Sequence, residues 1–195
     1  MIINTEDDII RLVREDDWMM DVLHTAQALQ LPDWWVCAGF VRSKLWDTLH
    51  GYRARTPLSD VDVIYYDAGN MEEAEEKKCE QRLRIARPSI PWSVKNQARM
   101  HLVSDAPPYS SSVDAMSKFP ETATALGLTI DERGRLVLAA PCGIEDVLRM
   151  AVKPTPFFEA SDERIRYYKA RLAKKNWESR WPKIHISSPR ESYGL

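Results

Sequence analysis

Hydrophobic positions recur with two different periods along the chain, and the change of period predicts a mixture of helices and strands. Between residues 9 and 29, apolar residues return every three or four positions, which is the spacing of one face of a helix. Thr5, which is followed by three acidic residues, is typical of a helix N-cap. The pattern therefore predicts one N-terminal helix that begins after Thr5 and is closed by Pro32.

Short apolar runs and glycine or proline breaks mark the remaining elements. Residues 34–38 are aromatic and β-branched, which predicts a buried strand. Gly39 permits a tight turn into a helix over 41–49, and Gly51 marks the end of that helix. We predict further strands over 60–66, 92–95, 128–130 and 136–138, and further helices over 71–85, 113–125 with an interruption at Pro120, 144–152 and 162–175. This mixture indicates an α/β (α+β) fold.

The composition is that of a folded domain. Of the 195 residues, 44% are hydrophobic and 29% are charged, which suits a single domain with an ample core. The net charge of −2 argues against a protein that coats nucleic acid, so we expect no DNA partner. The acidic N-terminus is unlike a signal peptide, and no apolar stretch approaches the roughly 20 residues needed to span a bilayer. We therefore expect a cytoplasmic protein with no membrane partner.

Two carboxylates, Asp60 and Asp62, open the predicted strand over 60–66. Residues two apart in a strand point to the same side, so both side chains project together. Neighbouring carboxylates repel each other unless a cation lies between them. Mg²⁺ prefers oxygen ligands and keeps coordination sites open for substrate phosphates. The spacing thus predicts a site for Mg²⁺, with Mn²⁺ as the alternative, beside a nucleoside triphosphate.

The order of these elements resembles a known superfamily. A strand, a glycine turn, a helix, a basic loop and a strand with Asp-x-Asp are similar to the head of the DNA polymerase β nucleotidyltransferases, including CCA-adding enzymes and poly(A) polymerases. The chain more closely resembles a small bacterial family of nucleotidyltransferase-like proteins. That resemblance rests on Gly39–Arg42, Trp46–Gly51, Asp60–Val63 and Trp92–His101.

The resemblance implies a fold, an activity and a set of site residues. It implies a polymerase β-like fold with a small mixed sheet flanked by helices, formed by residues 1–160, and a basic and aromatic helical extension, 161–195, packed on it. The implied reaction moves a nucleoside monophosphate from an NTP to an unidentified hydroxyl on a small molecule, a protein or an RNA end, releasing pyrophosphate. Asp60 and Asp62 would be catalytic metal ligands. The implied nucleotide-binding residues are Gly39, Phe40, Arg42, Lys95 and Asn96.

The chain also departs from the superfamily pattern, which leaves an alternative open. A third carboxylate commonly comes from a neighbouring strand, but the strand over 92–95 supplies none, and neither Asp67 nor Asp105 can be assigned to that role. The alternative is a catalytically reduced nucleotide- or RNA-binding protein of the same fold. A phosphohydrolase is less consistent with the sequence, because no residue is placed to activate water. The tail over 164–183 interleaves basic and aromatic residues, which suits either RNA binding or a helix that packs its aromatic side chains.

Overall fold

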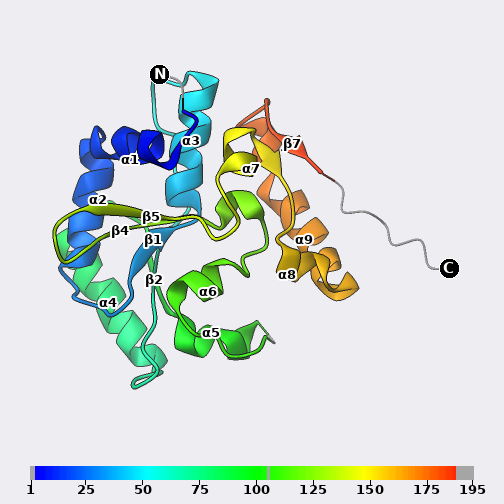
Figure 1. The fold of residues 1–195 in the computed structure, drawn as a ribbon. Helices are drawn as coiled ribbons and strands as arrows, with labels where there is room; N and C mark the ends of the chain where they lie inside the picture. Colours follow the sequence, from blue (N-terminus) through cyan, green and yellow to red (C-terminus); the bar gives the residue numbers. More distant parts are fainter. Residues whose placement is uncertain (1–2, 105, 188–195) are drawn as a thin grey trace.

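The computed structural model describes residues 3–104 and 106–187, and its centre is a five-stranded mixed sheet (Figure 1). The strands lie in the order β3-β2-β1-β4-β5. Neighbouring strands are antiparallel except for β2 and β3, which are parallel and are joined through helix α4 (Glu73–Ala86). The strand bounds are β1 Trp35–Cys37, β2 Val61–Tyr65, β3 Trp92–Asn96, β4 Gly127–Ile130 and β5 Leu136–Ala139. The predicted mixed sheet flanked by helices is confirmed.

The side chains of strand β2 alternate between the two faces of the sheet. Val61 and Val63 are fully buried in the main hydrophobic core, to which the helices α1 (Glu6–Arg14), α2 (Asp17–Gln27), α3 (Gly39–His50) and α4 contribute. Because successive side chains in a strand point to opposite faces, Asp62 and Ile64 face the other side. Ile64 packs there with Cys37 and Met116 in a second apolar cluster. The alternation therefore places Asp62 on the sheet face away from the N-terminal helices.

The prediction of one N-terminal helix is wrong, because the chain forms two helices, α1 (Glu6–Arg14) and α2 (Asp17–Gln27). Thr5 caps α1 as expected, accepting the backbone N–H of Asp8 at 3.2 Å. Asp16 interrupts the apolar stripe and caps α2 by accepting the N–H of Met19 at 3.0 Å. Asp16 also pairs with Arg55 at 2.7 Å, so a distant loop stabilises the break between the helices.

Several predicted helices are shorter than their apolar patterns suggest. The helix expected over 113–125 is α6 (Ser112–Met116) followed by the 3₁₀ turn η1 (Thr122–Thr124), because Pro120 lies between them. The helix expected over 144–152 ends at Leu148. The helix α3 and the later elements have these bounds: α3 Gly39–His50, α5 Gln97–Val103, α7 Glu145–Leu148, β6 Ala151–Val152, α8 Pro156–Glu159, α9 Asp162–Lys175, η2 Trp177–Ser179 and β7 His185–Ile186.

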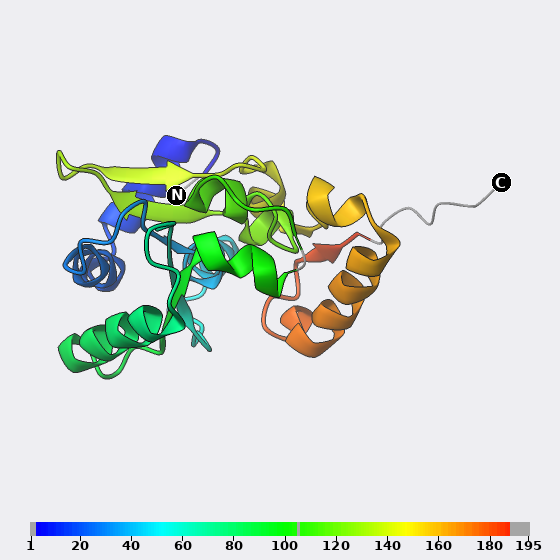
Figure 2. The ribbon, with the colours of Figure 1, turned by 90° about the horizontal axis from the view of Figure 1, so that it is seen from below.

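The C-terminal segment, which comprises α9 and residues 176–187, returns to pack on α3. Trp177 and Trp181 meet Trp46 of α3 edge to face, with ring centroids 5.7 and 5.2 Å apart. The indole N–H of Trp181 donates to Asp47 at 2.8 Å, and the backbone N–H of Lys183 donates to the His50 ring at 3.1 Å. Figure 2 shows the N-terminal helices and α9 on opposite sides of the molecule.

Within residues 3–104 and 106–187, no helix is both long and apolar enough to cross a membrane.

Candidate functional site

The two aspartates lie at the start of β2, where the chain enters the sheet. Asp60 is exposed and accepts a hydrogen bond from the Ser59 hydroxyl at 3.1 Å. Asp62 is half-buried one pleat further on. Burial, and then the charge of Asp60, raise the pKa of Asp62 to about 6, while a hydrogen bond from Ser93 and the charges of Lys175 and Arg171 lower it. The ionised form of Asp62 is therefore destabilised, and a cation bound beside the carboxylate would stabilise it.

The N-terminus of α3 faces these carboxylates across a small cavity. Ala38 adopts φ +56° and ψ −117°, which turns the chain sharply from β1 into the helix at Gly39. The amide groups of the first turn of a helix have no intrahelical acceptor, and the helix dipole favours an anion beside them. A Cβ placed on Gly39 would lie at ordinary contact distance from Arg42 Nη2, 3.7 Å, and from Leu58 Cδ2, 4.0 Å, and Gly39 itself lines the cavity. This turn can accept a phosphate group.

Arg42, in the first turn of α3, is held in a cage of three tryptophans. Its guanidinium carbon lies 5.1 Å from the ring centroid of Trp46, 4.2 Å from that of Trp177 and 5.3 Å from that of Trp181. Its Nη2 donates to the Ser43 hydroxyl at 3.1 Å, and its Nε is buried with no hydrogen-bond partner in the described part of the chain. Burial lowers the pKa of Arg42 to about 10, so the side chain is still a cation at neutral pH.

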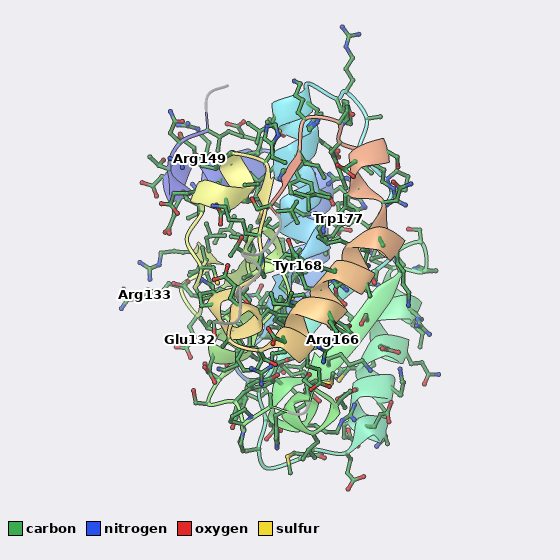
Figure 3. The ribbon with its side chains drawn as sticks, turned by 90° about the vertical axis from the view of Figure 1, so that its right-hand side faces the viewer. Glu132, Arg133, Arg149, Arg166, Tyr168 and Trp177 are labelled. Atoms are coloured by element: carbon green, nitrogen blue, oxygen red, sulfur yellow. The ribbon has the colours of Figure 1, made fainter. Side chains whose placement is uncertain are left out.

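The aspartates and Arg42 line one cavity of about 280 Å³, which we call the basic cavity. Its walls are the first turn of α3, the loop that leads to β2, and the C-terminal segment. Figure 3 looks onto that segment, with Tyr168 and Trp177 labelled along it. The segment adds three further cations to the cavity, namely Arg171, Lys175 and Arg180. The cavity thus sets four basic side chains opposite two carboxylates.

Arg171 is held in place by a buried carboxylate. Its Nε donates to Glu121 Oε1 at 2.7 Å, and Glu121 is fully buried. The hydroxyl of Thr124 donates to the other Glu121 oxygen at 2.9 Å. In the sequence, Arg171, Lys175 and Arg180 are recognisable only as members of the basic and aromatic tail over 164–183. The four-residue spacing of Arg171 and Lys175 along one helix face was the available signal, but nothing in the sequence indicated what that face would meet.

A second cavity, of about 600 Å³, adjoins the first, and we call it the aromatic cavity. Four residues line both cavities: Ala38, Asp62, Thr124 and Arg171. The larger cavity extends over the outer face of the sheet between α5, α6, α8 and α9. Asp62 and Arg171 therefore stand at the junction of a polar space and an aromatic one.

The structure brings together some predicted site residues and not others. Asp60, Asp62, Gly39 and Arg42 line the basic cavity. Lys95 lines the aromatic cavity, where its Nζ pairs with Glu76 at 3.2 Å.

Phe40 and Asn96 line neither of the two cavities. Nucleotide binding through these two residues stays a prediction. The Phe40 ring is buried in the core beside Trp18. The Asn96 side-chain amide donates to the carbonyl oxygens of Asp67 and Asn70 at 2.8 and 2.9 Å. Its carbonyl oxygen accepts the N–H of Ala98 at 3.1 Å as the cap of α5.

No third carboxylate joins the aspartate pair in the ranges 3–104 and 106–187, where no cluster of three His, Cys, Asp or Glu side chains is placed to hold a metal ion. Asp67 lies at the other end of β2 and accepts the N–H of Gly69 at 2.8 Å. Asp105 lies outside the described residues.

The chain is similar in sequence and in fold to known nucleotidyltransferases. The profile of a family described as nucleotidyltransferase matches residues 24–186. A protein whose NMR structure reveals a CCA-adding enzyme head domain is 36% identical, with a TM-score of 0.86, and the match covers 95% of this chain and 97% of that one. Among curated proteins, none matches the chain.

Two larger enzymes share the fold at low identity. A CCA-adding enzyme in complex with CTP matches at a TM-score of 0.57 and 13% identity, over 92% of this chain and 43% of that one. The Thermotoga maritima CCA-adding enzyme complexed with tRNA matches at 0.55 and 14% identity, over 92% of this chain and 42% of that one. The chain thus spans less than half the length of these enzymes. The family match over most of the sequence, with a 36% identical relative of almost equal extent, shows that the chain belongs to the nucleotidyltransferase family.

Proposed function

We propose that the protein transfers a nucleoside monophosphate from an NTP to a hydroxyl acceptor, with Mg²⁺ or Mn²⁺ as the metal and pyrophosphate as the leaving group. The observation that carries this proposal is the basic cavity, which two aspartates and four cations line together with the turn at Gly39. A triphosphate with its divalent metal has the charge pattern that complements such a cavity.

The aspartate pair fits a divalent metal. Two neighbouring carboxylates, one of them half-buried with its pKa raised to about 6, are stabilised by a cation placed between them. Mg²⁺ is commonly held by one or two carboxylates together with substrate phosphates, so the absence of a third carboxylate from the described residues is compatible with binding. When bound by Asp60 and Asp62, the metal would neutralise phosphate charge and lower the pKa of the attacking hydroxyl.

The other residues bind and orient the triphosphate. The backbone amides of Gly39 and Phe40 at the start of α3 would donate to phosphate oxygens, and Gly39 places no side chain before them. Arg42, Lys175 and Arg180 would neutralise the pyrophosphate, on which negative charge grows as it leaves.

Arg171 would act on the reacting phosphate, because it lines the junction of the two cavities. The acceptor oxygen forms its bond to the α-phosphorus as the bond from that phosphorus to the bridging oxygen of pyrophosphate breaks. The hydroxyl proton is released to solvent.

Solved enzymes of the same fold bear on the partners of the reaction. Solved enzymes of the same fold were captured with CTP, with ATP and with tRNA, which supports an NTP as donor. The acceptor class stays open among a small molecule, a protein and an RNA end. We expect the reaction to take place in the cytoplasm, without a membrane or DNA partner.

Pyrophosphate release tests the proposal. The purified protein is incubated with each NTP, Mg²⁺ or Mn²⁺ and cell extract as the source of acceptor, and wild type is compared with Asp60→Asn and Asp62→Asn. Asp67→Asn is the matched control, because it removes a carboxylate at the opposite end of the same strand. We expect release by wild type and the control only. Tight NTP binding by wild type without pyrophosphate release would overturn the proposal in favour of a nucleotide-binding protein that lacks turnover.

A further inference from the structure

The aromatic cavity has the position of an acceptor site, since it adjoins the basic cavity at the proposed reaction centre. Asp62 and Arg171 line both cavities, so a hydroxyl group in the aromatic cavity and a triphosphate in the basic cavity would meet at these two residues. Its volume of about 600 Å³ lies in the range of small-molecule sites, about 300–1,000 Å³.

Five aromatic side chains line this cavity, namely Tyr109, Phe119, Phe157, Phe158 and Tyr167. Tyr109 and Phe158 are buried in the walls, while Tyr167, which is 59% exposed, lies at the rim. The Tyr167 ring is 6.1 Å from that of Phe158, and the two rings are tilted by 46°. Flat ring faces of this kind bind nucleobases by stacking, whatever the base.

Cations accompany the rings. The guanidinium of Arg164 lies 3.8 Å from the ring centroid of Phe157 and donates to the Phe157 carbonyl at 3.3 Å. Lys118 lies 5.3 Å from the ring centroid of Tyr109 and pairs with Asp114. Apart from Asp62, Glu163 is the one carboxylate among the lining residues that the structure describes. Such a lining disfavours a polyamine-like acceptor and favours one that is both aromatic and anionic.

We propose that the aromatic cavity binds a nucleotide as the acceptor, and this inference rests on the proposed function. The acceptor base would stack on Tyr167 and its neighbouring rings, its phosphate would lie beside Arg164, and a ribose hydroxyl would point to Asp62. Transfer then forms a phosphodiester bond between the ribose oxygen and the α-phosphorus, with pyrophosphate leaving and the hydroxyl proton released. The nucleotide is either free or the terminal residue of an RNA strand, since both present the same chemistry.

Binding is measured first, without metal, so that the result does not depend on turnover. Equilibrium dialysis with labelled nucleoside monophosphates and with a short single-stranded oligoribonucleotide compares wild type with Tyr167→Ala and Arg164→Gln. The control is Arg166→Gln, which removes a cation from the same helix at an exposed residue that lines neither cavity (Figure 3). We expect about ten-fold weaker binding by each cavity variant, as is typical for the loss of a stacked ring, and wild-type binding by the control.

Turnover then separates the sources and the roles. With α-labelled NTP and Mg²⁺, label on the monophosphates identifies a free nucleotide as acceptor, and label on the oligoribonucleotide identifies an RNA end. An oligoribonucleotide that ends in a 3′-deoxynucleotide should accept none. The proposal is overturned if Tyr167→Ala binds as wild type does, if the variants raise the KM of the donor NTP instead of that of the acceptor, or if label appears only on protein. Nucleotide binding that depends on Tyr167, without any transfer, would contradict the proposed function but not the binding site.

Discussion

Replacing Asp62 with asparagine is expected to stabilise the metal-free protein at neutral and alkaline pH. Burial of the carboxylate, together with the charge of Asp60, raises the pKa of Asp62 from 3.8 to about 6. At about 1.4 kcal/mol for each pH unit, the ionised side chain lowers the free energy of unfolding by about 3 kcal/mol. Asparagine has a similar shape and no charge, so Asp62→Asn removes that penalty.

The expected pH dependence has a definite sign. Between pH 3.8 and about 6 the folded protein binds more protons at Asp62 than the unfolded chain does, so stability falls as the pH rises through this window. The stability that protonation supplies is fully present below about pH 3.8 and is lost as the pH rises through about 6. The gain from Asp62→Asn should therefore be largest at pH 8 and vanish near pH 4.

Urea unfolding of wild type and Asp62→Asn in EDTA, at pH 8 and at pH 4, measures this difference. Asp67→Asn is again the control, and it should not reproduce the pH-dependent gain. Saturating Mg²⁺ at pH 8 should stabilise wild type and not the Asp62 variant, because a ligand that binds only the folded state shifts the unfolding equilibrium. An Asp62 variant as stable as wild type at pH 8, or a gain that persists unchanged at pH 4, would refute the claim of a strained carboxylate.

Three further changes test the surroundings of the site. Glu121→Gln should lower kcat at least about ten-fold with a smaller change in the KM of the NTP, because the carboxylate that orients Arg171 loses its charge, and steady-state kinetics would contradict this if KM alone changed. Asn96→Ala should lower the free energy of unfolding by about 2 kcal/mol, since four hydrogen bonds including a helix cap are lost; urea unfolding that shows a variant as stable as wild type would contradict this. Trp177→Leu should weaken NTP binding by freeing Arg42 from its cage; fluorescence titration that gives the wild-type Kd would argue against a role for the cage.

Local sequence patterns predicted the elements that carry Gly39, Asp60 and Asp62. The strand before Gly39, the helix that follows it, and the same-side placement of Asp60 and Asp62 all follow from strand and helix periodicity, and the structure has them. Periodicity failed at Asp16, because a cap residue can occupy an apolar stripe without changing the spacing on either side. It also missed α5, where the capping role of Asn96 was the signal for a helix start.

The contribution of the C-terminal segment depends on tertiary contacts, and these have no local signature. Arg171 lines the same cavity as the aspartates and is held there by the buried Glu121, fifty positions earlier. In the sequence, Trp177 and Trp181 belong to a basic and aromatic tail far from Arg42. In the structure, their rings lie against the Arg42 guanidinium. The sequence alone left packing and nucleic-acid binding open for this tail. Its buried tryptophans pack on α3, while its cations line the basic cavity.

The central claim, transfer of a nucleoside monophosphate at Asp60 and Asp62, is tested most directly by following two labels of the same NTP. The protein is incubated with Mg²⁺, cell extract and either α-³²P-labelled or γ-³²P-labelled NTP, alongside an Asp60→Ala/Asp62→Ala variant. We expect the α-label to become attached to an acceptor while the γ-label is released as pyrophosphate, and we expect the variant to do neither. Release of the γ-label as inorganic phosphate with no attachment of the α-label, or equal transfer by the variant, would contradict it.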